Sequence, residues 1–181
     1  MRAILLNIAY MTYYRGITDA DTQINGTYDA FDQFNFCMAN LDDENVLIGY
    51  AETDKALPSD IFNEDGYVEP VLAVWVAKNA NGKLVIVGWY KDAVLYKDYC
   101  VCTFESDDAV CGYDQYFNVE ALFKNCVLLP ESERQKSIWE ISPDTVKNCD
   151  KHKNVWFADT EISQALNNKI NSYSGDNLLN Y

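Results

Sequence analysis

Two apolar runs of strand length lie in the middle of the chain, in the stretch VLAVWVAKNANGKLVIVGWY at 71–90. Both runs are apolar at nearly every position, which is typical of strands that are covered on both faces. Asn79, Ala80, Asn81 and Gly82 separate the runs, and an Asn-Gly pair supplies the positive φ angles of a tight turn. The pattern predicts a β-hairpin at the centre of the fold.

Weaker apolar patterns predict further strands around this hairpin. Residues 3–11 form one apolar run of strand length, and residues 46–52 form another after a short acidic segment. The second run predicts a hairpin whose turn holds Asp42, Asp43, Glu44 and Asn45. Residues 92–104 predict at least one more strand, in which alternation places Cys100 and Cys102 on one face. Between these runs, residues 12–36 predict a long ordered excursion, and residues 53–70 an exposed loop with one helical turn near 59–63.

Helical patterns lie in the last third of the chain. Residues 118–129 have apolar side chains at helical spacing after Asn118 as a candidate N-cap, although the Val-Leu-Leu end also fits a strand. Pro130 opens a polar turn or short helix. Residues 160–173 predict an amphipathic helix with Thr160 as N-cap. Its apolar stripe consists of Ile162, Leu166, Ile170 and Tyr173.

Together these elements predict an α+β fold in a single domain over residues 1–181. We expect a curved, mostly antiparallel sheet, with barrel-like closure left open as an alternative, and two or three helices at its flanks. A chain of this length buries roughly two thirds of its unfolded surface without metal or disulfide help. No window approaches a membrane span and no signal-peptide pattern opens the chain, so we expect a cytoplasmic protein with no membrane contact. We expect its six cysteines to be free thiols.

The formal net charge is −14, and the charge is unevenly distributed. Residues 1–70 carry 13 acidic and 3 basic side chains, whereas residues 71–181 carry 15 and 11. Such an excess of carboxylates repels a phosphate backbone, so free nucleic acid is a poor partner and a basic protein surface a better one. Acidity that only keeps the protein soluble is the plainer alternative.

The chain has few of the side-chain patterns that enzymes use for catalysis. His152 is the only histidine, and with Cys149 nearby it lies in the charged segment NCDKHKN, where no orienting group is evident. The Cys100-x-Cys102 spacing does not suit a zinc knuckle, and the chain has neither a phosphate-binding glycine loop nor a carboxylate-lysine nuclease pattern. We therefore expect no enzymatic activity, no metal and no cofactor.

Aromatic side chains are abundant on the predicted strands. Trp75, Trp89, Tyr90, Tyr96 and Tyr99 lie in or after the central hairpin, while Tyr10, Tyr13 and Tyr14 lie near the start. Strand aromatics mostly form core or cross-strand pairs. The alternative is a pocket in which an unpaired base stacks between rings.

Several short segments carry a family resemblance. The segments VIVGWYKDAVLYK at 85–97, NCVLLPESER at 125–134 and NVWFAD at 154–159, with YMTYYRG at 10–16, FNF at 34–36 and IGY at 48–50, keep one order along the chain. They resemble an accessory domain found beside HNH endonuclease modules in bacterial restriction-like proteins. The chain departs from that pattern in Tyr10, where the family has tryptophan, and in INGTYDA at 24–30, where it has a glycine-rich loop. The resemblance implies a nucleic-acid setting and a role as a reader of DNA features.

Size and acidity give a second similarity, to anti-CRISPR proteins of mobile elements that block Cas9, whose nucleic-acid channels are lined with Lys and Arg. The first hypothesis is therefore a non-enzymatic inhibitor that acts as a DNA mimic and binds a basic groove of a guided nuclease. Its candidate contacts are Asp42, Asp43, Glu44, Glu64 and Asp65. The alternative is a reader of a modified or flipped base, with candidates Trp75, Trp89, Tyr90, Tyr13 and Tyr14. A structural or regulatory subunit is a third possibility.

Overall fold

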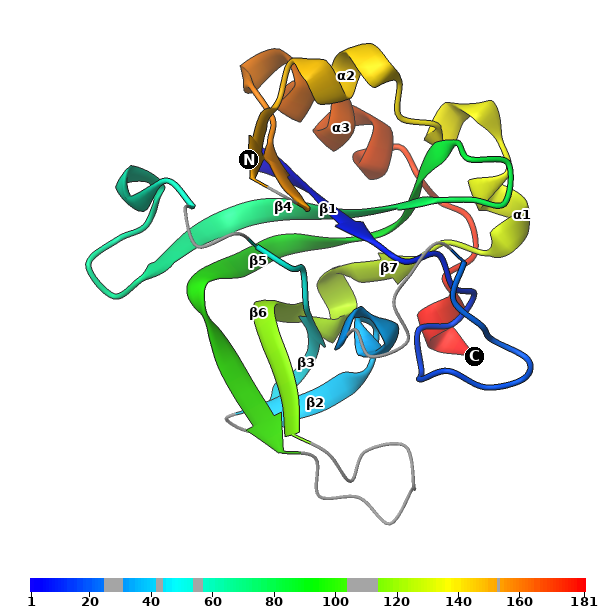
Figure 1. The fold of residues 1–181 in the computed structure, drawn as a ribbon, viewed down its shortest axis with the longest axis horizontal. Coiled ribbons are helices and arrows are strands. Elements are labelled where there is room, and N and C mark those ends of the chain that lie inside the picture. The colour runs from blue at the N-terminus through cyan, green and yellow to red at the C-terminus, as the bar shows by residue number, and fades with distance from the viewer. Residues whose placement is uncertain (25–30, 42–43, 54–56, 104–113, 153) are drawn as a thin grey trace.

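The computed structural model of the chain describes residues 1–24, 31–41, 44–53, 57–103, 114–152 and 154–181 (Figure 1). The predicted central hairpin is confirmed as strands β4 (Tyr67–Lys78) and β5 (Leu84–Thr103), which pair antiparallel. Gly82 has φ +74 in the connecting turn, and the Asn79 side chain accepts hydrogen bonds from the backbone N–H groups of Asn81 and Lys83. The predicted loop at 53–70 is wrong at its end, because β4 begins at Tyr67. The helical turn expected within that loop is the short 3-10 helix η2 (Ser59–Ile61).

One curved sheet holds the strands in the order β2–β3–β6–β5–β4–β1–β9–β8, and β7 pairs with β5 beside this path. The remaining strands are β1 (Arg2–Ile8), β2 (Met38–Leu41), β3 (Glu44–Gly49), β6 (Asp114–Leu122), β7 (Cys126–Leu128), β8 (Asp150–His152) and β9 (Val155–Phe157). All neighbours are antiparallel except β1 and β4, which are parallel. Among the described residues the path does not close on itself. The α+β prediction is confirmed in its open form.

The long strand β5 bends in its middle and changes partners there. Residues 84–96 pair with β4, whereas Val94 to Thr103 pair with β6. Asp92, with φ +50, and a register shift between Leu95 and Cys100 mark this bend. Figure 1 shows the second half of β5 turning away from the central hairpin and running beside β6. A separate strand at 92–104 was therefore the wrong prediction, because the bulged backbone continues one strand through the polar break.

Both faces of the central hairpin are covered. One face packs Trp75, Tyr90 and the buried N-terminal residue Tyr14 into a first core. The other face packs Trp89 with Trp139 and the C-terminal helix into a second core. Three α-helices among the described residues cover that second face or its margin, namely α1 (Glu131–Arg134), α2 (Pro143–Lys147) and α3 (Thr160–Asn171) (Figure 1). Within the described chain none of the helices is long and apolar enough to cross a membrane.

The helix predicted at 118–129 is wrong, because that segment forms β6, the 3-10 helix η3 (Phe123–Asn125) and β7. Val119 and Ala121 alternate on one face and pair with Gly49 and Leu47 of β3, so long-range pairing replaces the helical spacing. Asn118 caps no helix. Its buried side chain accepts from Ala51 N–H and donates to the Ala51 carbonyl, at 3.0 Å each.

The C-terminal helix is confirmed as α3. Leu166 and Ile170 are buried in the second core, with Ile162 and Tyr173 packed beside them. The predicted cap at Thr160 is wrong by one residue, because the Asp159 carboxylate accepts from Ile162 N–H at 2.8 Å. The short helix α1, which follows Pro130, confirms the prediction there.

Candidate functional site

The strongest charge asymmetry lies on the part of the sheet beyond the bend of β5. We call this part the acidic arm: β2, β3 and the following residues to Thr53, residues 57–69, residues 93–103 of β5, and β6. Its exposed or half-buried carboxylates are Glu44, Glu52, Asp60, Glu64, Asp65, Glu69, Asp98, Asp114 and Glu120. Among the described residues, Lys97 is the single basic side chain of the acidic arm, and Lys124 lies just beyond the end of β6.

The helical side of the molecule has a more balanced charge. Its ion pairs include Lys83–Glu140 at 2.7 Å, Lys136–Glu133 at 2.5 Å and Lys147–Asp144 at 3.2 Å. Arg2, Lys91 and Lys169 add further positive charge there. The excess of carboxylates is therefore a property of the acidic arm rather than of the whole surface.

The predicted acidic contacts fall on the acidic arm, at two separate places. Glu64 and Asp65 are exposed in the turn before β4. This turn lies beside the bend of β5, because Lys97 N–H donates to the Gly66 carbonyl at 2.9 Å. Glu44 is exposed at the start of β3, whose register places it beyond the Leu122 end of β6. The structure does not bring the two sets together. Asp42 and Asp43 lie outside the described residues.

Four aromatic rings form a continuous row, which we call the aromatic row: Tyr116, Phe31, Tyr50 and Tyr99. Three of them belong to the acidic arm, and Phe31 comes from the 3-10 helix η1 (Phe31–Phe34). The ring centroids along the row are 5.0, 5.4 and 5.1 Å apart in that order, and the Tyr50 and Tyr99 rings are stacked at 24°. Tyr116 is 42% exposed and Tyr99 is 39% exposed. Val101, directly opposite Tyr116 on the neighbouring strand, is 52% exposed. The row is thus an apolar surface within an acidic surround.

Hydrogen bonds hold the aromatic row in place. The Asn35 side chain accepts from Tyr50 N–H at 2.7 Å and donates to the Tyr50 carbonyl at 2.8 Å. The Tyr99 hydroxyl accepts from Thr53 N–H at 2.9 Å, and Gln115 donates to the Phe31 carbonyl at 3.0 Å. Side chains that are fixed before binding lose less conformational entropy on docking. The row is therefore preorganised as a contact surface.

The Tyr50 hydroxyl of the aromatic row stays neutral at physiological pH, because its pKa is raised. Burial raises the pKa of Tyr50, and the neighbouring Tyr99 and Glu52 raise it further. Neutral rings keep the negative π-face that attracts cations. The chemistry of this surface suits a cationic, partly apolar partner.

The residues predicted for base reading lie mostly in the cores. Trp75, Tyr90 and Tyr14 are fully buried in the first core, and Trp75 and Tyr90 are 5.3 Å apart. Trp89 is 2% exposed on the opposite face of the sheet, where it stacks on Trp139 at 5.6 Å. Tyr13 is 45% exposed. The structure does not bring these five rings together, and four of them have no face open to a base.

The N-terminal YMTYYRG segment is held by two buried charged groups. The Asp21 carboxylate accepts from the backbone N–H groups of Thr12, Tyr13 and Tyr14, at 2.6, 2.8 and 3.1 Å. Arg134 is 1% exposed and donates to the carbonyls of Leu129, Met11 and Thr12, at 2.7, 2.6 and 2.8 Å. These hydrogen bonds hold the backbone, so the two residues have a structural role.

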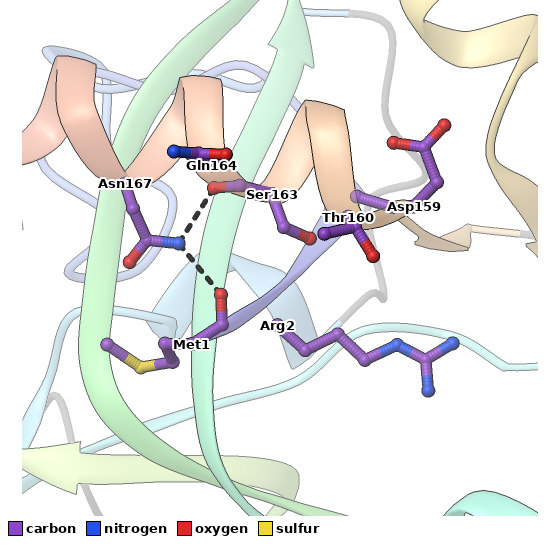
Figure 2. A pocket seen from close by; sticks show the side chains of 8 residues that line it. Met1, Arg2, Asp159, Thr160, Ser163, Gln164 and Asn167 are labelled. Atoms are coloured by element: carbon purple, nitrogen blue, oxygen red, sulfur yellow. Dashed lines mark hydrogen bonds between the residues drawn. The ribbon is translucent and has the colours of Figure 1, made fainter.

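A hollow of about 720 Å³ lies where β1 meets α3 (Figure 2). Figure 2 shows the Asn167 amide between Met1 and Ser163, donating to their carbonyls at 2.8 and 2.7 Å. The Ser163 hydroxyl accepts from Ala3 N–H at 3.0 Å, and the Arg2 guanidinium lies 5.0 Å from the Phe157 ring centroid. The polar groups of this hollow join helix to strand, and they include no nucleophile paired with a base.

No metal-binding cluster is found within the described residues. Burial raises the pKa of the Cys100, Cys126 and Cys149 thiols, which keeps them protonated and weakly nucleophilic. The side chain of His152 is not among those described.

No family model, curated protein or solved structure matches this chain. The resemblance to the HNH-associated accessory domain stays a prediction.

The sequence contained only part of the signal for the aromatic row. Strand alternation at 99–101 indicated that Tyr99 and Val101 share a face. Phe31, Tyr50 and Tyr116 come from three other segments, so their proximity required the fold.

Proposed function

We propose that this protein is a non-enzymatic, cytoplasmic inhibitor that docks its acidic arm onto the basic nucleic-acid groove of a bacterial guided nuclease of the Cas9 type. It would act as a DNA mimic, by occupying lysines and arginines that otherwise contact the phosphate backbone. The proposal places the protein in the anti-CRISPR-like class, a product of phage or other mobile elements.

One observation carries the proposal, namely the concentration of exposed carboxylates on the acidic arm against Lys97 and Lys124. Guided nucleases hold their heteroduplex and displaced strand in channels lined with Lys and Arg. Complementary potentials speed association and exclude wrong partners, and close charge pairs across an interface couple by about 1.5–7 kcal/mol. A one-sided acidic surface on an ordered scaffold meets those requirements.

A cleavage assay tests the proposal. Purified protein is added to a guide-loaded Cas9-type nuclease from a bacterial host, and cleavage of target DNA is measured. We expect inhibition by the wild type and at least about tenfold weaker inhibition after Glu64→Lys, Asp65→Lys and Asp98→Lys together, because each reversal turns an attraction into a repulsion.

The matched control is a triple reversal on the helical side, Asp144→Lys, Glu161→Lys and Asp176→Lys, which changes the net charge by the same amount. The control should inhibit as the wild type does. Equal loss in both triple variants would mean that only net charge matters and would contradict docking through the acidic arm.

The base-reader alternative has one supporting feature, the exposed rings of the aromatic row, on which a base could stack. The surrounding carboxylates oppose phosphate approach, which favours the inhibitor. A gel shift with plain and modified oligonucleotides separates the two, since retardation of a modified oligonucleotide would support the reader.

A further inference from the structure

Three of the four rings of the aromatic row belong to the acidic arm, and the two end rings are ordered but open to solvent. Tyr99 and Tyr116 are 39% and 42% exposed, although each touches another ring of the row. A cluster of exposed tyrosines at the centre of a charged surface is the usual composition of a binding hot spot.

We propose that the aromatic row is an arginine-binding site, where the guanidinium of a partner protein lies over the Tyr99 or Tyr116 ring and is attracted by nearby carboxylates. This inference rests on the proposed function and names the side chain that the acidic arm recognises.

The chemistry of the row selects arginine over lysine. A guanidinium is planar and weakly hydrated, so it stacks on an aromatic face and still donates hydrogen bonds at its edge. An ammonium is compact and strongly hydrated, and it gains less from a ring. The exposed Val101 beside Tyr116 also favours the longer apolar contact of a stacked arginine.

The position of the carboxylates supplies charge complementarity. Glu52 lies close enough to Tyr50 to influence its titration, and Tyr99 hydrogen-bonds to the adjacent Thr53. Asp114 lies two residues before Tyr116 on β6, so strand alternation places both side chains on one face, and Asp114 pairs with Thr103 of β5. A phosphate-bearing ligand meets repulsion at this site, so the occupant is a protein side chain.

The test compares two probes of equal length and charge, an oligo-arginine and an oligo-lysine peptide. Binding of each to the full chain is measured by titration calorimetry at low salt. We expect the arginine peptide to bind about threefold to tenfold more tightly, the range that a cation–π contact supplies.

Three variants locate this preference. Tyr99→Leu and Tyr116→Leu remove a π-face and keep an apolar side chain, so the fold is retained and the arginine preference should shrink toward onefold. Tyr181→Leu, at a tyrosine that is 79% exposed outside the aromatic row, should keep the preference. Thermal unfolding of each variant verifies that it is folded.

The outcomes separate this inference from the proposed function. Equal affinity of the wild type for both peptides, or a preference that survives Tyr99→Leu and Tyr116→Leu, overturns the arginine site and leaves charge-driven docking intact. Absence of binding to either peptide overturns the proposed function as well.

Discussion

The Asp32 carboxylate is only 8% exposed. It accepts from Ala9 N–H at 2.7 Å and from Gln23 Nε2 at 3.2 Å, while the buried Gln23 Oε1 has no hydrogen-bond donor among the described residues. Burial is the largest influence on its pKa and raises it, despite these donors. The ionised form is therefore less favourable in the folded protein than in the unfolded chain.

Replacing Asp32 by Asn should stabilise the protein at neutral pH, because a neutral amide avoids the cost of burying charge and can donate to Gln23 Oε1. A raised folded-state pKa gives a stabilising contribution that is complete below the unfolded-state pKa of about 3.9 and is lost as pH rises through the folded-state pKa. The free energies of unfolding of wild type and variant should therefore differ at pH 7 and converge below about pH 4. Urea unfolding across this range measures both, and a difference independent of pH would contradict the account.

The buried Arg134 is predicted to be structurally essential. Arg134→Met removes three donors and leaves the carbonyls of Leu129, Met11 and Thr12 without them, which should cost about 3–5 kcal/mol of unfolding free energy. Arg15→Met is the control, since Arg15 is exposed and its hydrogen bond to the Tyr181 carbonyl is long, at 3.3 Å. Chemical denaturation measures both. Equal effects would mean that the three hydrogen bonds contribute little.

At the scale of elements, two substitutions test which residue caps the N-terminus of α3. Asp159→Ala removes the acceptor for Ile162 N–H and should cost about 1 kcal/mol. Thr160→Ala, at the cap expected from sequence, should change the unfolding free energy by less than about 0.5 kcal/mol. Thermal or urea unfolding of the two variants checks this order, and the reverse order would restore Thr160 as the cap.

Elements with local signals could be predicted, and elements fixed by distant pairing could not. The hairpin of β4 and β5 follows from Asn81 and Gly82 between two valine-rich runs, and α3 follows from its apolar stripe. The strand β6 was missed because Leu122, Cys126 and Leu129 match helical spacing, whereas its pairing with β3 links segments about 70 residues apart. The continuity of β5 depends on the positive φ of Asp92, which a sequence pattern does not reveal.

The residues of the candidate site could likewise be predicted only where their signal is local. Glu64 and Asp65 could be predicted as exposed because turn residues surround them, and the structure places them on the acidic arm. The predicted turn at 42–45 is wrong for Glu44 and Asn45, because both belong to β3 and pair with Leu41 and Asn40 of β2, although Glu44 is exposed there. Trp75, Trp89 and Tyr90 gave the sequence its aromatic signal, yet their strands are covered on both faces. The aromatic row needed four segments brought together by the sheet.

At the scale of the whole molecule, the chain has a net charge of −14, and the acidic arm has, among its described residues, nine exposed or half-buried carboxylates against Lys97, which implies internal repulsion. Self-repulsion destabilises the compact state and is screened by salt. The melting temperature should therefore rise as NaCl is added from low ionic strength, and Asp98→Lys should raise it at low salt and have less effect at high salt. Differential scanning calorimetry measures both, and a melting temperature that falls with added salt would contradict a repulsive arm.

The most direct test of the central claim is hydrogen–deuterium exchange of the chain, free and in complex with a guide-loaded Cas9-type nuclease. We expect new protection in the turn at 63–66, in the second half of β5 and in β6, with exchange in α2 and α3 unchanged. Protection confined to α2 and α3, with the acidic arm exchanging as in the free protein, would contradict the account.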